Sequence, residues 1–319
     1  DDGLQEVQHV LTPTMCLLTS NSASAVPWPA AFLRRNAHDP GFLAALPGLI
    51  ADSAARWVLT MDLPFPDIGY NYVAPATRAD GTRCVLKISR HIDDTRNEIA
   101  ALHLWDGDGC CRLLEVDTGL GALLLERLEP GSMLTEVAAR DDDEATRIAA
   151  SVLRTLWRAM PTADQGLRSL DSWCEAFDNN REAILGGDLG FPPDLFRRAD
   201  SLRAELLVST RDPVVLHGDL HHFNVLRARR AEWLAIDPKG LAGDRCFDVC
   251  MFQRNPWPGP QDPRVNARRL DIFCDELGLD RERTKAWCIV HAVLDACWSF
   301  EDGEPLEEKL AWAERTLRF

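Results

Sequence analysis

One stretch of this sequence constrains the chain more than any other. Residues 214–226 read Val-Val-Leu-His-Gly-Asp-Leu-His-His-Phe-Asn-Val-Leu, so an apolar run leads into a polar segment and a second apolar run follows it. Residues 234–238, Leu-Ala-Ile-Asp-Pro, form another apolar run, and this one ends in a carboxylate. Short apolar runs between polar segments are typical of buried strands. We therefore predict strands that bring Asp219, Asn224 and Asp237 to one place.

The bulk properties narrow the class of protein. The 319 residues are enough for two lobes, and 46% hydrophobic and 27% charged residues are ordinary for a globular chain. No apolar run approaches the roughly 18 residues of a membrane-spanning helix, and no basic segment precedes the apolar residues 15–18. We therefore expect neither a membrane partner nor secretion. The ten cysteines include no C-x-x-C pair, which favours reduced thiols in a cytoplasmic protein.

The formal net charge of −15 bears on the partner. Nucleic acids are bound by basic surfaces, so this charge argues against a nucleic-acid partner. It favours a small cationic molecule, although a merely acidic, solvated surface explains the charge at least as well. We expect a monomer or a weak dimer.

The pattern of the chain predicts an α+β class with two lobes. Residues 1–30 show no clear period and are expected to form a poorly ordered extension. Residues 31–130 are expected to form a small lobe around an antiparallel sheet, which ends where Glu129-Pro130-Gly131 breaks the pattern, and residues 131–319 a larger, mainly helical lobe. In the small lobe we predict one or two helices over 32–57 and strands at 57–61, 70–76, 84–88, 112–116 and 122–128. In the large lobe we predict helical structure from Thr135 onward and further helices at about 169–185, 193–209, 245–254, 264–278, 281–299 and 304–317.

A lysine lies inside the apolar strand expected at 84–88. A buried charge is unfavourable unless another group pairs with it. Glu98, near the start of a helix that opens around Thr95, is the candidate partner of Lys87. If the strand lies at the edge of its sheet, Lys87 could instead extend along the surface to solvent.

These residues fit the pattern of a phosphoryl-transfer site. His-Gly-Asp-Leu-x-x-x-Asn over 217–224 matches the kinase catalytic loop His-Arg-Asp-Leu-x-x-x-Asn, with Gly218 in place of arginine. Asp237 takes the place of the metal-binding aspartate of Asp-Phe-Gly, and the lysine and glutamate of the small lobe supply the strand–helix pair. Each element is weak evidence alone, but their order along the chain makes the combination specific.

On these motifs the chain resembles the aminoglycoside phosphotransferase family, and within it the branch of streptomycin 6-kinases and hydroxyurea phosphotransferases. The likeness extends over roughly residues 31–319. It rests on Leu216-His-Gly-Asp-Leu-His-His-Phe-Asn224, Trp233-Leu-Ala-Ile-Asp-Pro-Lys-Gly-Leu-Ala-Gly-Asp244, Phe247-Asp248, Arg78-Ala-Asp-Gly-Thr-Arg83, Leu123-Leu-Leu-Glu-Arg-Leu128, Trp298 and Glu301-Asp302-Gly303. It implies a bilobal protein-kinase-like fold that uses ATP, with GTP as the alternative donor, and Mg²⁺ to phosphorylate a hydroxyl of a streptomycin-like aminoglycoside.

The resemblance also implies a role for each residue. Asp219 would orient and help to deprotonate the acceptor hydroxyl, and Asn224 and Asp237 would bind Mg²⁺. Lys87, held by Glu98, would contact the α- and β-phosphates. In addition, the backbone from Glu126 to Leu128 would read the nucleotide base, and Asp248 would brace the catalytic loop from a buried position.

The sequence departs from protein kinases in two places. The loop over 66–71 contains one glycine and no G-x-G-x-x-G, so phosphate contacts there stay open. Pro238 replaces the phenylalanine of Asp-Phe-Gly, and nothing resembles a phosphorylated activation loop. We therefore expect no regulation of the protein-kinase type.

The histidines and cysteines have simpler interpretations. His217 is expected to be a packed, hydrogen-bonded loop residue, because Asp219 already fills the role of base. His221 and His222 could join His217 in a zinc site only on a helix, which the apolar flanks argue against. Cys246 and Cys250 are expected on one helix face against the core.

Recognition of the acceptor is expected from carboxylates of the helical lobe. Glu301 and Asp302 are the favoured pair, because carboxylates bind ammonium and guanidinium groups, and the wider set adds Glu175, Asp178, Asp295, Glu304, Glu307 and Glu308. The alternative for each is a solvated helix face. Two other functions stay open: a kinase of another small hydroxylated metabolite, such as an amino alcohol or a sugar, and an inactive nucleotide-binding protein of the same fold.

Overall fold

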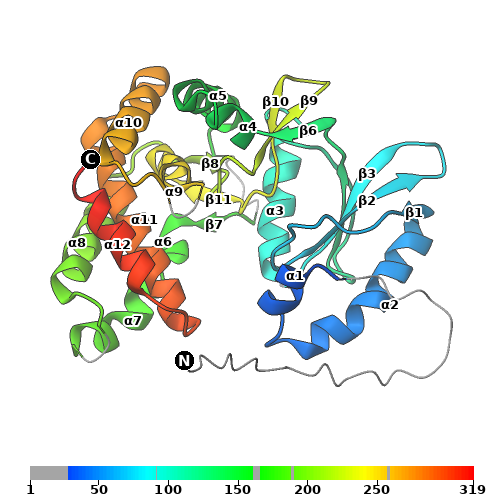
Figure 1. The fold of residues 1–319 in the computed structure, drawn as a ribbon, viewed down its shortest axis with the longest axis horizontal. Helices are drawn as coiled ribbons and strands as arrows, with labels where there is room; N and C mark the ends of the chain where they lie inside the picture. The colour runs from blue at the N-terminus through cyan, green and yellow to red at the C-terminus, as the bar shows by residue number, and fades with distance from the viewer. Residues whose placement is uncertain (1–27, 91, 161–165, 188–189, 257–258) are drawn as a thin grey trace, which may run out of the picture.

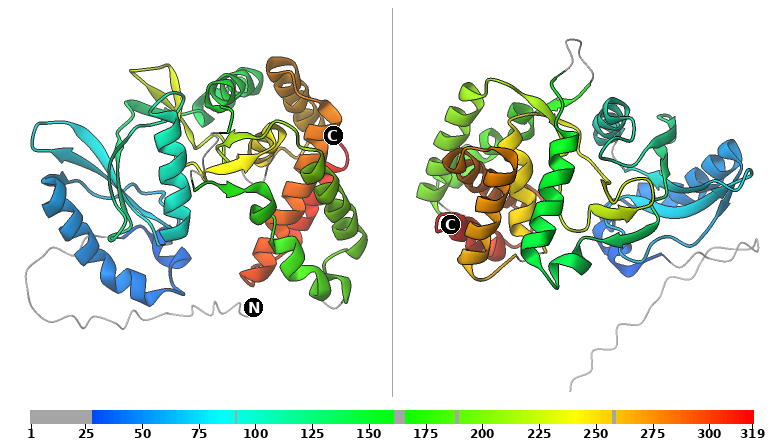
Figure 2. Two further views of the ribbon diagram at one scale, coloured as in Figure 1. Left: turned by 180° about the vertical axis from the view of Figure 1, so that it is seen from behind. Right: turned by 90° about the horizontal axis from the view of Figure 1, so that it is seen from above.

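A computed structural model describes residues 28–90, 92–160, 166–187, 190–256 and 259–319. Most of the extension expected over residues 1–30 lies outside the described residues. Two lobes lie side by side in Figures 1 and 2, one built around a sheet and the other mainly from helices. Among the described residues, no helix combines the length and the apolar character that crossing a membrane requires.

The first lobe contains a five-stranded antiparallel sheet in the order β1-β2-β3-β5-β4. Its strands are β1 (Leu59–Met61), β2 (Tyr72–Arg78), β3 (Arg83–Ile88), β4 (Leu113–Asp117) and β5 (Ala122–Glu126). The hairpin between β2 and β3 turns at Gly81, which has φ +87°. The prediction for residues 57–61 was too long at its start, because α2 (Pro40–Trp57) runs to Trp57 and Val58 ends that helix with φ +51°.

Alternation along the strands separates the two faces of this sheet. Leu86 and Ile88 of β3 pack in the cluster that includes Phe32 of α1 (Ala30–Arg35) and Leu46 of α2. Val85 and Lys87, which alternate with these two residues, point to the other face of the sheet, since successive strand side chains alternate. Val85 packs with the cluster of α3 (Ile92–Trp105), and the lysine of β3 faces that same helix.

The chain enters the second lobe through a strand that the sequence pattern did not predict. β6 (Pro130–Met133) pairs with β9 (Val225–Ala228), which in turn pairs with β10 (Trp233–Ala235). Gly131 is required there, because its φ is +78° and a Cβ atom would lie 2.9 Å from the carbonyl oxygen of Leu128. We propose that the lobes divide at residue 130, because β6 belongs to a sheet of the second lobe.

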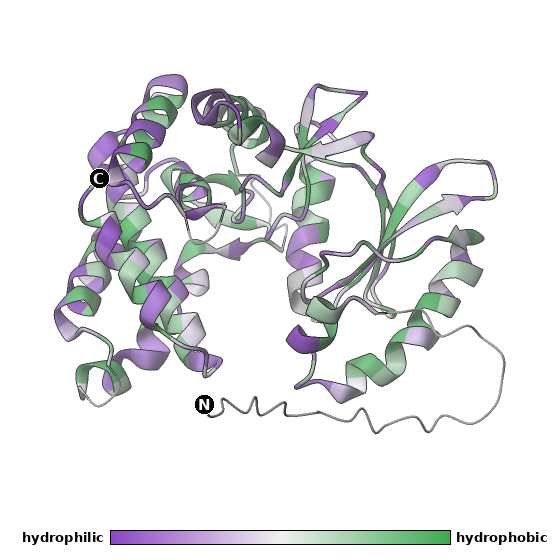
Figure 3. Cartoon of the chain, in the orientation of Figure 1, coloured by the Kyte–Doolittle hydropathy of each residue, from purple (hydrophilic) through white to green (hydrophobic). Residues whose placement is uncertain are grey.

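Helices make up most of the second lobe, as predicted. They are α4 (Thr135–Ala138), α5 (Asp142–Leu156), α6 (Leu170–Trp173), α7 (Ala176–Leu185), α8 (Pro193–Ser209), the 3₁₀ helix η1 (Arg245–Val249), α9 (Cys250–Arg254), α10 (Pro263–Leu277), α11 (Arg281–Glu301) and α12 (Glu307–Thr316). Asp141 caps α5, accepting a hydrogen bond from the backbone of Glu144 at 3.0 Å. Hydrophobic and hydrophilic positions interleave along α5 and α10 (Figure 3), as expected for helices with one buried face.

The core of the helical lobe forms around α11. Trp287, Val290 and Leu294 of this helix are fully buried among residues of α8, α12 and η1. Cys246 and Cys250 pack in the same core, as predicted, but they lie on two consecutive helices, η1 and α9, and not on one. A small sheet of β7 (Arg168–Ser169), β11 (Leu241–Gly243) and β8 (Val214–Leu216) lies between this core and the first lobe (Figure 1).

Candidate active site

The hairpin of β9 and β10 brings two oxygen-bearing side chains together. Val225 pairs with Ala235, and the N–H of Ile236 donates to the carbonyl of Asn224 at 2.9 Å. Asn224 at the start of β9 is therefore opposite the end of β10, where Asp237 follows with φ +58°. The predicted convergence of these strands is correct, although the 214–216 strand pairs with β11 rather than with the hairpin.

A buried carboxylate braces the loop between β8 and β9. Asp248 of η1 accepts hydrogen bonds from the N–H groups of His217 and Gly218, at 3.1 and 2.7 Å, and from Nε1 of Trp157 at 2.9 Å. Burial raises the pKa of Asp248 to about 6, against the lowering effect of these donors. Three donors on one carboxylate fix the backbone that carries Asp219.

The position of Gly218 explains why arginine is absent there. Its φ is +78°, and a Cβ atom would lie 2.8 Å from Cδ1 of Leu241. A side chain would therefore meet both backbone strain and a neighbour from β11. The departure from the protein-kinase loop is a packing requirement of this chain.

Two of the three loop histidines are structural. His217 is fully buried, donates from Nε2 to the carbonyl of Ile236 at 2.9 Å and accepts from the N–H of Asp219 at Nδ1. Burial lowers the pKa of His217 to about 4, so the ring is neutral near pH 7. His222 stacks on Phe252 with ring centroids 3.8 Å apart. The packing expected for His217 is confirmed.

His221, the third histidine of this loop, lies beside the carboxylate of Asp219. Its Nδ1 accepts from the N–H of Phe223 at 3.3 Å, and Nδ2 of Asn224 lies 3.4 Å from the other ring nitrogen, Nε2. That nitrogen lies 3.7 Å from Oδ1 of Asp219. Burial lowers the pKa of His221, so the ring adds no positive charge near pH 7.

Lys87 connects the two lobes at the site. Its Nζ lies 2.6 Å from Oε2 of Glu98 on α3 and contacts Oδ1 of Asp237 from the second lobe. The side chains of Lys87 and Glu98 are each 5% exposed. Burial alone would lower the pKa of Lys87, but the carboxylates of Asp237 and Glu98 raise it, so this lysine is a cation. The predicted partnership of Lys87 and Glu98 is confirmed.

Sequence reasoning gave no role to Lys239, which lies between two of the predicted site residues. Its Nζ is 3.4 Å from Oδ2 of Asp219 and 3.8 Å from Oδ2 of Asp237. Burial would raise the pKa of Asp237, but Lys87 and Lys239 lower it, which keeps that carboxylate ionised. The available signal was the position of Lys239 two residues after Asp237, directly beyond the predicted metal ligand.

The residues present fit a divalent cation with oxygen ligands. Nδ2 of Asn224 donates to the carbonyl of Asp219 at 3.0 Å, so the amide oxygen is the free end of that side chain. No described residue donates a hydrogen bond to it. This amide oxygen and the ionised carboxylate of Asp237 are the ligand types that Mg²⁺ prefers.

The segment expected to read the nucleotide base is held by an arginine from the other lobe. Glu126 accepts hydrogen bonds from Nε and Nη2 of Arg230, at 3.1 and 2.8 Å, and from the N–H of Arg112 at 3.0 Å. Burial opposes ionisation, but these arginines lower the pKa of Glu126. Its carboxylate is thus occupied, which leaves the backbone up to Leu128 for a base. The sequence carried no signal for Arg230, because it lies in an ordinary turn.

The acidic candidates for the acceptor differ in their availability. Glu301 is exposed, but its Oε1 accepts from Nδ2 of Asn180 at 2.9 Å, while Asp302 is exposed at the end of α11. Asp295 is 6% exposed and pairs with Arg254 and with Lys309, the latter at 2.9 Å. The charge of Asp295 is therefore already balanced within the protein.

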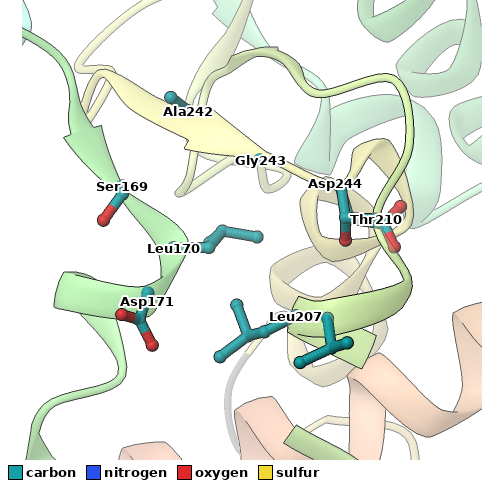
Figure 4. A pocket seen from close by; sticks show the side chains of 9 residues that line it. Ser169, Leu170, Asp171, Leu207, Thr210, Ala242, Gly243 and Asp244 are labelled. Carbon is teal, nitrogen blue, oxygen red and sulfur yellow. The ribbon is translucent and has the colours of Figure 1, made fainter. Parts of the chain in front are cut away.

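A separate pocket of about 450 Å³ opens beside β11, on elements that the catalytic residues do not use (Figure 4). It is lined by Ser169, Leu170, Asp171, Leu207, Val208, Thr210, Ala242, Gly243 and Asp244. Its buried carboxylate, Asp244, already accepts from Arg283 and from Nε1 of Trp287. The lining includes neither Asp219 nor the predicted metal ligands, so this pocket is distinct from the candidate active site.

Known proteins share much of this sequence. A family model described as aminoglycoside/hydroxyurea antibiotic resistance kinase matches residues 56–303. A hydroxyurea phosphotransferase of Kitasatospora aureofaciens is 36% identical over 86% of this chain and 80% of its own. A streptomycin 6-kinase of Streptomyces glaucescens is 37% identical over 86% of this chain and 91% of its own.

The fold is shared with more distant kinases. The crystal structure of choline kinase LicA from Streptococcus pneumoniae superimposes with a TM-score of 0.59 at 13% identity, over 86% of this chain and 98% of that one. The predicted bilobal α+β, protein-kinase-like fold is therefore confirmed. With a matching family model and relatives above one-third identity over most of its length, the chain belongs to the family of aminoglycoside and hydroxyurea antibiotic resistance kinases.

Proposed function

We propose that this protein is an ATP-dependent O-phosphotransferase that moves the γ-phosphoryl group to a hydroxyl of a streptomycin-like aminoglycoside. The observation that carries the proposal is the contact of Lys87 with both Glu98 and Asp237. This contact joins the nucleotide side of the first lobe to the loop that holds Asp219 and Asn224. A protein that only bound nucleotide would not need Asp219 beside Lys87, Glu98 and Asp237.

The residues divide the work of phosphoryl transfer. Lys87, oriented by Glu98, meets the α- and β-phosphates, and the backbone from Glu126 to Leu128 receives the base. Asn224 and Asp237 hold Mg²⁺, which when bound neutralises charge on the phosphates. Asp219 accepts a hydrogen bond from the acceptor hydroxyl and takes its proton as the new O–P bond forms.

Carboxylates of the second lobe suit a cationic acceptor. Streptomycin carries guanidinium groups, which suit carboxylates such as Glu301 and Asp302 at the end of α11. The chain's net charge of −15 attracts a cation from solution. A second candidate is hydroxyurea, a neutral molecule, because a phosphotransferase named for it is 36% identical to this chain.

Mass spectrometry of each acceptor, after incubation with protein, Mg²⁺ and ATP or GTP, tests the proposal. The expected result is a mass gain of one phosphoryl group on streptomycin. If only hydroxyurea gained the mass of a phosphoryl group, the protein would still be a kinase, but the aminoglycoside would not be its acceptor. A panel with choline, homoserine and amino sugars covers the remaining class, the kinases of other small metabolites.

Asp219→Asn gives the matched test of the chemistry. The amide keeps the shape of the side chain but cannot take the proton, so we expect turnover to fall by at least about 10²-fold. Affinity for nucleotide should stay within about threefold, because Asp219 does not touch Lys87 or Glu98. Turnover at the wild-type rate would show that Asp219 is not the base.

The cysteines bear on the compartment in which the enzyme works. All nine cysteines in the described part of the chain are free thiols. Free thiols fit a reducing compartment, so we place the enzyme in the cytoplasm, where ATP is available. We propose that it acts as a monomer or a weak dimer, which light scattering at several concentrations would measure.

A further inference from the structure

Lys239 occupies the space between the donor and acceptor sides of the site. Its Nζ lies 3.4 Å from Oδ2 of Asp219 and 3.8 Å from Oδ2 of Asp237. In the proposed function Asp219 meets the acceptor hydroxyl, whereas Asp237 lies with Lys87 on the nucleotide side. A phosphoryl group that moves from one substrate to the other passes between these two carboxylates. The ammonium group of Lys239 therefore lies beside the path of transfer.

The backbone holds Lys239 firmly in this place. Its N–H donates to the carbonyl of His217 at 2.7 Å, which ties it to the braced catalytic loop. The next residue, Gly240, has φ +64° and approaches α3 so closely that a Cβ atom would lie 2.0 Å from the carbonyl oxygen of Asn97. The side chain is 34% exposed, so it reaches into the accessible site. A cation held in this way needs little reorganisation during reaction.

The two lysines of the site face different oxygens of the Asp237 carboxylate. Lys87 contacts Oδ1 and is also bound by Glu98, whereas Lys239 faces Oδ2 and Asp219. The catalytic loop itself places the ring of His221 beside Asp219, with Nε2 3.7 Å from Oδ1 of the carboxylate. Lys239 adds a positive charge beside Asp219 from the segment after β10.

We propose that Lys239 is a catalytic residue that contacts the γ-phosphoryl group while it is transferred; this inference rests on the proposed function. The acceptor oxygen forms its bond to the γ-phosphorus as the bond from that phosphorus to the β–γ bridging oxygen breaks. The hydroxyl proton passes to Asp219, and ADP leaves with the bonding electron pair. Lys239 keeps its proton throughout and offsets the negative charge on the oxygens of the phosphoryl group.

Lys239→Met is tested first by nucleotide binding without any acceptor. Calorimetric titration with Mg²⁺ compares ADP with the imido analogue of ATP, which retains a γ-phosphoryl group. We expect the variant to bind ADP within about twofold of the wild type and to lose most of the wild-type preference for the analogue. In turnover, kcat should fall by about 10²–10³-fold, with the KM of the acceptor little changed. Lys239→Arg should recover part of kcat because it keeps the charge.

Lys285→Met, a matched loss of a lysine on α11, should behave as the wild type in every measurement. The proposal is overturned if Lys239→Met keeps both the preference for the analogue and a kcat within about threefold. It is equally overturned if both nucleotides weaken alike together with the melting temperature, because Lys239 would then be a structural bridge. The wild type could phosphorylate neither streptomycin nor hydroxyurea and still prefer the analogue in a way that depends on Lys239. In that case the proposed substrates are wrong, whereas the contact of Lys239 with the γ-phosphoryl group is supported.

Discussion

Replacing His222 by phenylalanine should make the protein less sensitive to acid. The ring of His222 is fully buried and stacks on Phe252 at 3.8 Å, with an angle of 25° between the ring planes. Neither ring nitrogen has a hydrogen-bond partner among the described residues. Burial therefore lowers the pKa of His222 from 6.5 to about 2. Phenylalanine preserves the stacked shape and has no proton to bind.

The sign and size of the effect follow from the two pKa values. As pH falls below 6.5, the histidine of the unfolded chain takes up a proton, whereas the folded chain does not until about pH 2. Stability is therefore present above pH 6.5 and is lost progressively as pH falls toward 2. Between pH 7 and pH 5 the loss of unfolding free energy from His222 amounts to about 2 kcal/mol. The phenylalanine variant avoids this loss.

Urea unfolding at pH 7 and pH 5 measures the difference. The unfolding free energy should fall between these values by about 2 kcal/mol less in His222→Phe than in the wild type. His103→Phe, which changes an exposed histidine of α3, provides the control and should follow the wild type. An equal fall in His222→Phe and the wild type would refute the reasoning, because it would mean that His222 binds a proton in the folded state. Other titrating groups cancel, since both proteins contain them.

Two further changes test the frame of the catalytic loop. Asp248→Asn replaces an acceptor oxygen by an amide group that faces the N–H of His217 or Gly218. We therefore expect the unfolding free energy, measured in urea, to fall by about 1–3 kcal/mol and kcat to fall more than tenfold. Unchanged values of both would contradict the bracing role of Asp248. Gly240→Ala puts a Cβ atom 2.0 Å from the carbonyl of Asn97 at a φ of +64°. The loss of unfolding free energy should exceed about 1–2 kcal/mol. A melting temperature equal to that of the wild type would show that α3 can move away from the new Cβ atom at little cost in free energy.

Local patterns of the sequence predicted most of the longer elements and grouped most of the residues of the proposed site. Strand β3 follows from its apolar run, and its lysine called for a partner, which Glu98 supplies from the next helix, 11 residues along the chain. Asn224 and Asp237 could be placed together because a short hairpin brings its two ends to the same point. Such inferences work because neighbours in sequence are constrained to be neighbours in space.

Other features depend on contacts between distant segments. Strand β6 was not predicted, because its four residues, Pro-Gly-Ser-Met, have no strand pattern and become a strand only by pairing with β9. Arg230 joins Glu126 across 104 residues of sequence. No local signal marks such a contact, since its free energy is gained only after the lobes have packed.

The sequence by itself determined which chemistry this protein can perform. Asp219, Asn224 and Asp237 were identified from their order and flanking strands, and with Lys87 they make up the proposed phosphoryl-transfer site. Only the tertiary structure decided which further groups enter that site. It brought Lys87 to Asp237 across 150 residues and placed Lys239 between the two acids. The physical reason is that a motif fixes residue types within a loop, whereas the direction of each side chain depends on packing from every element around it.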